Sequence, residues 1–565
     1  MGKTDMIYKD PALRSSVLVN GNMAGPRAHL RGMGMTSGEM AKPFIGVVNT
    51  FNELHPGHVH LNRLGQFVKD GVREAGGIPF EVNTISICDG FTLGHPGMCS
   101  VLPSREVIAD SVELFANAYA LDGLVLLAGC DKIVPAMIMA ALRVNIPTII
   151  VTGGPMMPGE YKGKQYATYE LKEMVAQMKR GEISPEEYEY MEGLMSPGPG
   201  SCAMMGTANT FSIVAEALGL TMPESACAHA VSGKKNRVAK LSGLQIMELV
   251  RSNLRPRDIV TQKMLELGVR VALSVGGSTN MCLHFPAIAH EAGLHMTLEE
   301  IGALSATTPY LTKIKPSGKH TMYDLDQAGG VPAVMRELGE GGVIDLDQMT
   351  VTGKTHRDNI EAMPFLETNH DVIRTVANPY SQHGSICVLK GSLAPDGSVV
   401  KQSAVVPQMR SHIGPARCFE KEEMAIDAIL AGNIRPGDVI VIRNEGPQSG
   451  PGMREMLTAT SALVSMGLHE TTALVTDGRF SGATRGPCIG HVSPETSKRG
   501  PIAAVRDGDM IEIDIDRGIL NLMVDPVELN RRLTALPVFK PVVTEGYLSR
   551  YAKEVSSADK GAILE

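Results

Sequence analysis

The stretch LVLLAGCDKIVPAMIMAALRVNIPTIIVTGG, residues 124–154, decides the fold class. It contains an apolar, β-rich run at 124–129, a helical pattern at 135–144 and a second apolar run at 148–154. Strands that are nearly all apolar are typical of a sheet that is covered on both faces. A strand–helix–strand order of this kind predicts a βαβ unit and therefore a mainly parallel sheet.

The same alternation continues toward the N-terminus. FIGVVNT (44–50) predicts another buried strand, and SREVIADSVELFANAYAL (104–121) predicts a helix. The charged segment 166–195 predicts a helical insertion on the surface. We therefore expect an α/β domain over residues 1–365, in which helices flank a mainly parallel sheet.

The pattern changes after about residue 365, where short strands separated by DG, GD and RG turns dominate. The strand-rich segments lie at 385–405, 437–446, 473–478 and 508–524. They predict a smaller, β-rich and barrel-like domain over residues 366–565. A chain of 565 residues is too long for one compact core, so two domains are expected.

The composition favours small-molecule chemistry over nucleic-acid binding. The formal net charge is −8, Trp is absent and aromatic residues make up only 4%, which provides neither a basic surface for phosphates nor a stacking platform for bases. The polar N-terminus and the lack of an apolar run of about 18 residues predict neither a signal peptide nor a membrane span. Nine scattered cysteines, an odd number, are typical of a reduced, cytoplasmic protein without disulfides.

The segment GCDK (129–132) directly follows the predicted strand at 124–129. Open α/β sheets bind ligands at the carboxyl ends of their strands. The thiol of Cys130, the carboxylate of Asp131 and the amine of Lys132 therefore lie where a site is expected. The alternative is an ordinary strand exit with a buried cysteine and a solvated Asp–Lys pair.

A second carboxylate lies in ISICDGFTLGHPGM (85–98), where Asp89 follows another apolar run that we interpret as a strand. Carboxylates at two strand ends can share a Mg²⁺ ion, because this hard cation prefers oxygen ligands. Asp-Gly after a strand is also a common turn, so the alternative is a turn without a metal.

Two further loops carry side chains with reactive chemistry. Cys202 ends PGPGSC (197–202), just before a helix predicted at 206–218. Glycines allow the backbone to approach an inorganic cluster, and a cysteine there can be a thiolate ligand. Ser481 lies on a turn where a hydroxyl can react, although no His–Asp partner pattern accompanies it. The alternatives are a structural loop cysteine and an ordinary turn serine.

Taken together, these segments resemble the dihydroxy-acid dehydratase family, which also includes phosphogluconate and sugar-acid dehydratases. The resemblance rests on NTFNELHPGHVHL (49–61), DGFTLGHPGMCSVLPSREVIADSVE (89–113), GCDKIVPAMIMAALRVNIPTIIVTGGPM (129–156), GSCAMMGTANT (200–210), VGGSTN (275–280), AGGVPAV (328–334), VIRNEGPQSGPGMREM (441–456) and VTDGRFSGATRGPCIGHVSPE (475–495). Their order, spacing and content match over nearly the whole chain.

The resemblance implies a set of cofactors and site residues. The cofactors would be Mg²⁺ and an iron–sulfur cluster, of the 2Fe–2S type that the family pattern favours or of the 4Fe–4S type. Ser481 would act as the base that removes the C2 proton of the substrate. The ligands would be Cys130 and Cys202 for the cluster, and Asp89, Asp131, Glu455 and a carboxylated Lys132 for Mg²⁺.

The resemblance also implies a substrate. DGFTLGHPGM (89–98) and LPSREVIADSVE (102–113) are most similar to the branched-chain amino-acid enzyme. This implies dehydration of 2,3-dihydroxy-3-methylbutanoate and its ethyl homologue to 2-keto acids, in valine and isoleucine biosynthesis, by a cytoplasmic homodimer or homotetramer. The alternatives are a sugar-acid dehydratase of the same family and, in another class, a non-catalytic iron–sulfur sensor.

One departure from the family pattern concerns the cluster. Many members have a cysteine in a Pro-Cys-Asn segment where this chain reads Pro56-Gly57-His58, although other members also have Pro-Gly-His. The change removes one familiar cluster ligand. It leaves the third ligand open among Cys88, Cys99 and His58.

Overall fold

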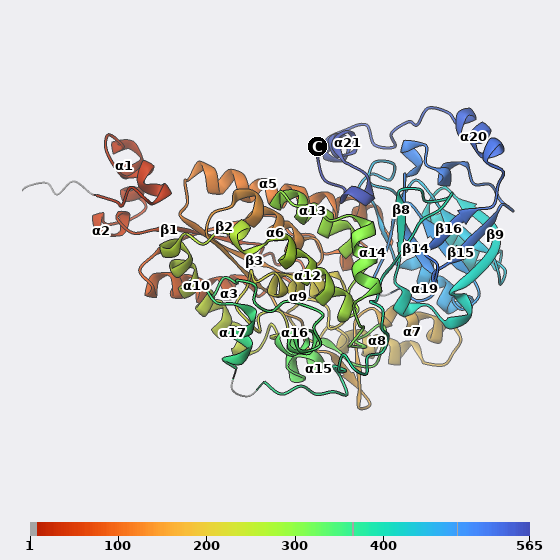
Figure 1. Ribbon diagram of the computed structural model, residues 1–565, viewed down its shortest axis with the longest axis horizontal. Helices are drawn as coiled ribbons and strands as arrows, with labels where there is room; N and C mark the ends of the chain where they lie inside the picture. The colour runs from red at the N-terminus through yellow and green to blue at the C-terminus, as the bar shows by residue number, and fades with distance from the viewer. Residues whose placement is uncertain (1–7, 364–365, 483) are drawn as a thin grey trace, which may run out of the picture.

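The computed structural model describes residues 8–363, 366–482 and 484–565. The molecule is elongated, and its N-terminal half, coloured red to green, lies beside its C-terminal half, coloured cyan to blue (Figure 1). The domain boundary predicted after residue 365 falls on residues outside the described ranges and stays a prediction. Of the helices in the described ranges, none is both long and apolar enough to cross a bilayer.

Four parallel strands form the sheet of the N-terminal half, in the order β2-β1-β3-β4. The strands span Phe44–Asn49 (β1), Ile78–Asn83 (β2), Gly123–Ala128 (β3) and Thr148–Thr152 (β4). Every residue of β1, β3 and β4 is buried, as their apolar runs predict. The predicted α/β fold with a parallel sheet is confirmed.

The sequence interpretation is wrong around residues 78–88. Strand β2 was not predicted, because it lies at the edge of the sheet and its apolar residues are interrupted by exposed polar ones. The run at 85–88, interpreted as a strand, contains none. Asp89 instead begins the short helix α4 (Asp89–Thr92) after a loop.

Helices cover both faces of this sheet. On one face α3 (Leu61–Glu74) packs against α10 (Gly233–Ser252). On the other face α5 (Pro103–Ala118) packs against α6 (Ile133–Val144). This is the arrangement that right-handed crossovers produce when successive connections run in opposite directions along a sheet. The helices predicted at 104–121 and 135–144 are thereby confirmed.

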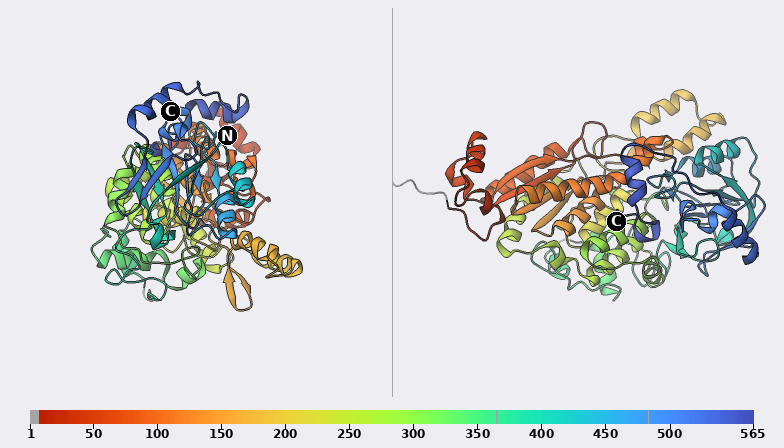
Figure 2. Two further views of the ribbon diagram at one scale, coloured as in Figure 1. Left: turned by 90° about the vertical axis from the view of Figure 1, so that its right-hand side faces the viewer. Right: turned by 90° about the horizontal axis from the view of Figure 1, so that it is seen from above.

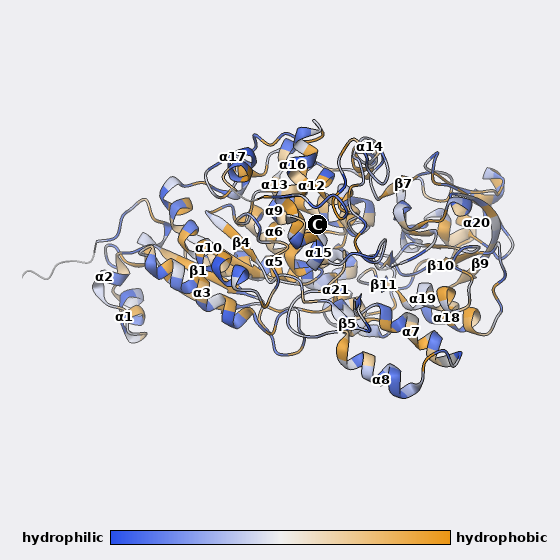
Figure 3. Cartoon of the chain, turned by 90° about the horizontal axis from the view of Figure 1, so that it is seen from below, coloured by the Kyte–Doolittle hydropathy of each residue, from blue (hydrophilic) through white to orange (hydrophobic). Residues whose placement is uncertain are grey.

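Beyond β4 the N-terminal half consists mainly of helices, and the most apolar of them form its centre, which is orange in Figure 3. The central helices are α9 (Thr207–Ala217), α12 (Gln262–Ser274) and α13 (Met281–Ala292). Helices α9 and α13 pack against α6, and α12 packs against both of them. Other helices of this part are α11 (Pro256–Ile259), α14 (Leu298–Ala306), α15 (Met322–Gln327), α16 (Gly330–Glu340) and α17 (His356–Glu361). Two short helices, α1 (Ala24–Gly32) and α2 (Ser37–Met40), precede the sheet.

The charged segment 166–195 forms two surface helices, as its pattern predicts. They are α7 (Glu170–Lys179) and α8 (Pro185–Leu194), and they follow a hairpin of β5 (Gly159–Tyr161) and β6 (Lys164–Tyr166) that was not predicted. The insertion projects from the body of the molecule (Figure 2). Helix α7 packs against α19 (Thr458–Ser465), so the insertion also connects the two halves.

The C-terminal half contains an eight-stranded sheet in the order β16-β15-β9-β10-β12-β14-β8-β7. The strands span Cys387–Leu389 (β7), Gly397–Val400 (β8), Ser411–Phe419 (β9), Val439–Ile442 (β10), Ala473–Thr476 (β12), Cys488–Ser493 (β14), Met510–Asp514 (β15) and Ile519–Leu522 (β16). Lys390, which follows β7, bridges to Ile519 of β16, so the two edges of the sheet nearly close. The predicted barrel-like domain is confirmed.

Helices and the C-terminal tail complete this half. The helices are α18 (Glu422–Leu430), α19, α20 (Pro526–Ala535) and α21 (Gly546–Glu554). The tail then returns to the N-terminal half, where Ala558–Lys560 packs against α13. The guanidinium of buried Arg105 donates hydrogen bonds to the carbonyl oxygens of Gly561 at 2.9 Å and Ala562 at 2.8 Å.

Candidate active site

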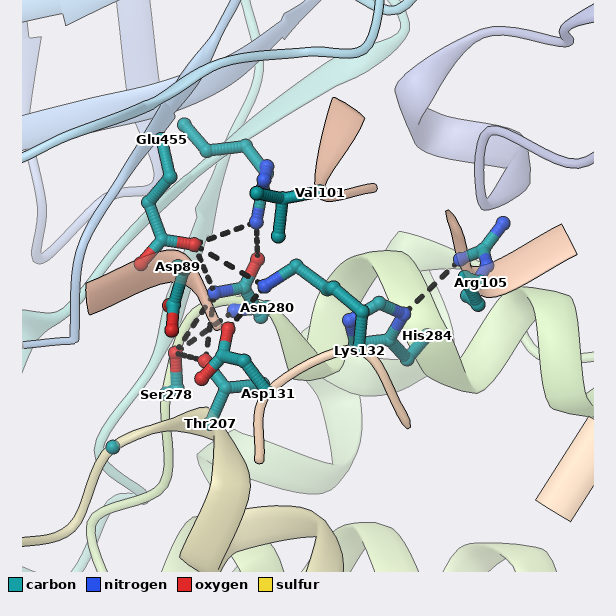
Figure 4. A network of polar contacts seen from close by, with 12 residues as sticks. Asp89, Val101, Arg105, Asp131, Lys132, Thr207, Ser278, Asn280, His284 and Glu455 are labelled. Atoms are coloured by element: carbon teal, nitrogen blue, oxygen red, sulfur yellow. Dashed lines mark hydrogen bonds and ion pairs between the residues drawn. The ribbon is translucent and has the colours of Figure 1, made fainter. Parts of the chain in front are cut away.

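Three acidic side chains from distant segments meet where the two halves join (Figure 4). Asp131 follows β3, Asp89 begins α4, and Glu455 begins the short strand β11 (Glu455–Met456) of the C-terminal half. One oxygen of each lies within 4.8 Å of the others. The structure therefore brings together the three carboxylates that the sequence indicates, at the sheet edge where ligands bind in open α/β folds.

A buried network fixes one oxygen of Glu455. This Oε2 atom accepts hydrogen bonds from Lys132 Nζ at 3.3 Å, Asn280 Nδ2 at 3.0 Å and Arg479 Nη1 at 2.6 Å. Lys132 also forms an ion pair with Asp131, and it is fully buried, as is Arg479. Charged donors make strong hydrogen bonds, so the carboxylate of Glu455 is held in one orientation.

The three carboxylates shift one another's protonation. Removal from water and the charges of Asp131 and Glu455 hold the pKa of Asp89 well above its usual range. Burial also raises the pKa of Asp131, although Lys132 opposes this shift. Burial acts in the same direction on Glu455, but the charges of Lys132 and Arg479 outweigh it, and the pKa of Glu455 is lowered. Crowded carboxylates of this kind are the oxygen donors that a hard divalent cation prefers.

A second group, of sulfur and nitrogen atoms, lies beside the carboxylates. One ring nitrogen of His55 and the Sγ atoms of Cys88 and Cys130 lie within 4.8 Å of one another. A hydrogen bond between the two thiols lowers the pKa of Cys88 and raises the pKa of Cys130. Cys88 directly precedes Asp89, and Cys130 directly precedes Asp131. Each of the two loops therefore presents a thiol to one group and a carboxylate to the other.

Backbone geometry holds Cys130 in place. Its φ is +64°, in the left-handed region that non-glycine residues seldom adopt and that is common at functional sites. A Cβ on the preceding residue, Gly129, would lie 2.7 Å from the carbonyl oxygen of Gly57. The close approach of the two loops at this point therefore requires a glycine.

Cys202 reaches the same region on another loop. The N–H of Gly200 donates to the carbonyl oxygen of Pro56 at 2.8 Å, so this loop contacts the loop that carries His55. Burial, followed by the charges of Cys88 and Asp89, raises the pKa of the Cys202 thiol. Cys202 is thus close enough to interact electrostatically with both groups.

The structure separates the three candidates for a further cluster ligand. Cys88 lies beside Cys130, as described. Both ring nitrogens of His58 are engaged by backbone carbonyl oxygens, of Thr50 at 2.5 Å and Gly129 at 2.9 Å. The thiol of Cys99 donates to the carbonyl oxygen of Gly450 at 3.4 Å. Burial, followed by the charge of Glu445, raises the pKa of this thiol, so the charges that act on it belong to a different set of residues from those of the site.

Ser481 lies next to the strand pair that carries Glu455. It follows β13 (Arg479–Phe480), which pairs in parallel with β11 so that Arg479 lies opposite Glu455. The N–H of Ser481 donates to the carbonyl oxygen of Met456 at 3.0 Å, which extends the ladder by one step. The residue is partly exposed, as a group that meets a substrate must be.

Sequence reasoning assigned no role to three residues of the site: His55, Asn280 and Arg479. All three lie within or next to the segments NTFNELHPGHVHL, VGGSTN and VTDGRFSGATRGPCIGHVSPE that carry the family resemblance. Their place inside these segments was the available signal. Asn280 lies 175 residues from Glu455 and 199 residues from Arg479 in the sequence, so these contacts depend on the folded arrangement.

Comparisons with known proteins place the whole chain in one family. Residues 42–359 match the family described as "Dihydroxy-acid/6-phosphogluconate dehydratase N-terminal", and residues 371–562 match "Dihydroxy-acid/6-phosphogluconate dehydratase C-terminal". The dihydroxy-acid dehydratase 1 of Methanosarcina acetivorans is 52% identical over 556 residues, which cover 98% of this chain and 100% of the relative.

Two other relatives come from other organisms. The dihydroxy-acid dehydratase of Caldicellulosiruptor bescii is 50% identical over 554 residues, which cover 98% of this chain and 100% of that protein. The dihydroxy-acid dehydratase of Methanococcus maripaludis is 51% identical over 540 residues, covering 95% and 97%. The chain belongs to the dihydroxy-acid/6-phosphogluconate dehydratase family and is an enzyme of the hydro-lyase class.

Proposed function

We propose that the protein dehydrates 2,3-dihydroxy-3-methylbutanoate and its ethyl homologue to 2-keto acids, as a step in valine and isoleucine biosynthesis. The observation that carries the proposal is that the cluster of two cysteines and a histidine lies beside the cluster of three carboxylates, and that the pairs Cys88-Asp89 and Cys130-Asp131 connect the two clusters. Dehydration removes a proton and a hydroxyl from neighbouring carbons. Two adjacent electrophilic centres therefore suit one small substrate, and the names of the relatives support this substrate class.

The cluster of three carboxylates provides suitable ligands for Mg²⁺. Asp89, Asp131 and Glu455 would supply three of its oxygen ligands. Lys132, which is buried between two of these carboxylates, would supply a fourth after carboxylation, in which its amine adds CO₂ and releases a proton. The carbamate offers an anionic oxygen where an ammonium group would repel the metal.

The cysteines beside the carboxylates provide suitable ligands for an iron–sulfur cluster of the 2Fe–2S or 4Fe–4S type. Cys130 and Cys202 would be its thiolate ligands, supported by the glycine-rich surroundings that allow close approach of the backbone. When bound, Mg²⁺ and the cluster iron would supply the Lewis acidity that activates the C2 proton and the C3 hydroxyl of the substrate.

The protein's own side chains would handle the proton and the geometry. Ser481 would remove the C2 proton, because its strand lies against the strand of Glu455. Asn280 and Arg479 would keep Glu455 oriented throughout the reaction. Buried, pre-oriented dipoles and charges need little reorganisation during the reaction, which is a major source of rate enhancement.

The test is a turnover assay on anaerobically purified protein that has been supplied with iron, sulfide and Mg²⁺. We expect conversion of 2,3-dihydroxy-3-methylbutanoate to a keto acid that reacts with a hydrazine reagent, and no conversion after treatment with a chelator. A panel of sugar acids run in parallel separates the alternatives. Activity on sugar acids alone would replace the proposed substrate, and a cluster-loaded protein without any turnover would favour the sensor.

The cytoplasmic location and the homodimeric or homotetrameric state remain predictions. Light scattering of the cluster-loaded protein at assay concentration measures the mass of the assembly. We expect about two or four times the mass of the 60.4 kDa chain. A monomer with full activity would contradict the predicted oligomer without affecting the proposed chemistry.

A further inference from the structure

The group of His55, Cys88 and Cys130 contains more potential ligands than the proposed function uses. Cys130 is the only one of the three with an assigned role. The Cys88 sulfur lies within 4.8 Å of the Cys130 sulfur and of a His55 nitrogen, and the side chain of Cys88 is half-buried. Two thiols at this separation, on loops from different strands, can bind one cluster without a large change in the backbone.

His55 shows that the group is built for a partner. The residue is 4% exposed, and within the described ranges both of its ring nitrogens are buried without a conventional hydrogen-bond partner. Leaving a buried donor unsatisfied destabilises the folded protein. The ring faces the sulfur atoms of Cys88 and Cys130, and its interaction with the Cys88 thiol contributes to lowering the pKa of that thiol. The ring is therefore placed to donate a hydrogen bond to a sulfur atom.

Gly57 connects this group with the departure from the family pattern. This residue stands where many members of the family have a cysteine. A Cβ at Gly57 would lie 3.8 Å from the Cβ of Cys130, so a side chain there would point into the same group. It would also lie 3.1 Å from two ring atoms of His55, which is tighter than an ordinary contact. The ring of His55 thus crowds the position that a cysteine side chain at residue 57 would take.

We propose that Cys88 is the third thiolate ligand of the cluster, and that His55 occupies the place of the absent cysteine and donates a hydrogen bond to a sulfur atom of the bound cluster. The proposal rests on the proposed function, because it takes Cys130 and Cys202 as the other two ligands. The other candidates, His58 and Cys99, are held by backbone carbonyl oxygens as described above. The cluster ligand has therefore moved from one loop of the site to another.

The test measures cluster binding instead of turnover. Cys88→Ala and the matched control Cys99→Ala are purified anaerobically and supplied with iron and sulfide, and iron and sulfide are counted per chain. Mössbauer spectra of the loaded samples report the iron environment. We expect both Cys88→Ala and Cys130→Ala to bind the cluster at least about tenfold more weakly than the parent, and Cys99→Ala to match the parent. Equal cluster content and equal spectra for Cys88→Ala and the parent would overturn the proposal.

A second variant covers the case in which Cys88→Ala fails to fold. The triple variant His55→Ala/Gly57→Cys/Cys88→Ala lacks Cys88, has a cysteine at position 57 and lacks the ring of His55 that would crowd this cysteine. Recovery of iron and sulfide in this variant supports the proposal, and a folded triple variant without a cluster overturns it. A parent protein that binds no cluster, or a Cys130→Ala variant that retains it, contradicts the proposed function itself and is distinguishable from both results.

Discussion

At the residue scale, the two Cys-Asp pairs explain how one site can present soft and hard ligands side by side. Consecutive residues in an extended or turn conformation point in different directions, and the positive φ of Cys130 sharpens this divergence. Asp131 then faces the carboxylates while Cys130 faces Cys88. A thiolate group for iron and a carboxylate group for Mg²⁺ can therefore share two loops.

Replacement of the base tests the assignment of Ser481. In Ser481→Ala we expect unchanged cluster absorbance and Mg²⁺ binding, but loss of most turnover, because no hydroxyl remains to take the C2 proton. Anaerobic kinetics of the loaded variant measure the loss. The control is Ser465→Ala, whose hydroxyl bonds only a carbonyl oxygen of its own helix. A loss within about tenfold, or ~1.4 kcal/mol, would exclude Ser481 as the base.

The raised pKa of Asp89 predicts how metal removal affects stability. A carboxyl group whose pKa is higher in the folded than in the unfolded protein stabilises the fold at low pH. This contribution is lost as the pH rises from the pKa of the unfolded state through the pKa of the folded state. In a chelator, the Tm of the parent should therefore fall relative to Asp89→Asn as the pH rises above about 4, the ordinary pKa of an aspartate in an unfolded chain. Added Mg²⁺ should restore the parent only. The exposed control Asp70→Asn should follow the parent, and parallel Tm curves for the parent and Asp89→Asn would contradict the prediction.

At the scale of elements, the contact between α3 and α10 fixes one side of the sheet that carries the site. The helices approach so closely that a Cβ at Gly243 would lie 2.1 Å from the carbonyl oxygen of Val68. A Cβ at Gly71 would lie 2.2 Å from the carbonyl oxygen of Lys240. These two glycines therefore allow the backbones of the helices to touch.

Gly243→Ala should force the two helices apart. Overpacking of this kind costs about 1–3 kcal/mol, so the midpoint of urea unfolding should fall clearly. Gly193→Ala in α8 is the matched control, because a Cβ there meets nothing within 4 Å. It should be neutral or stabilising by up to ~1 kcal/mol, since alanine favours the helix more than glycine. Equal midpoints for Gly243→Ala and the parent would show that the contact is not as tight as described.

The elements also show what a sequence can and cannot predict. Strands β1, β3 and β4 are buried on both faces, so their apolar runs identify them. Strand β9 was not predicted, because its sequence SHIGPARCF mixes polar residues and a proline with short apolar pieces. At the site, Asp89, Asp131 and Lys132 were predicted from their place near strand ends or from family motifs. The position of His55 depends on its packing against Cys88 and Cys130, which no local pattern reports.

At the scale of the whole molecule, the C-terminal tail connects the two halves through Arg105. This fully buried residue pairs with Glu106 at 2.6 Å, bonds His284 at 3.0 Å and holds two carbonyl oxygens of the tail. His284 lies near Lys132 (Figure 4). Burial has the largest effect in lowering the pKa of His284, followed by the charge of Arg105 and then the charge of Lys132. The anchor of the tail thus adjoins the site.

Arg105→Met should weaken this connection. The substitution leaves Glu106 buried without its partner, which costs about 3–5 kcal/mol, and it frees the tail. Urea unfolding measures the loss, and limited proteolysis should cut the tail after residue 553 in the variant before the parent. The control Arg73→Met removes an exposed pair with Asp70 at 3.6 Å and should cost about 0–1 kcal/mol. Equal stabilities of the two variants would contradict the anchoring role.

The central claim is that an iron–sulfur cluster and a divalent metal occupy adjacent groups in one site. Anomalous scattering from crystals of the anaerobic, cluster-loaded protein, grown with Mn²⁺ in place of Mg²⁺, locates both metals in a single experiment. We predict iron bonded to Cys130 and Cys202, and manganese bonded to Asp89, Asp131 and Glu455. Iron at cysteines outside this site, or manganese away from these carboxylates, would contradict the claim.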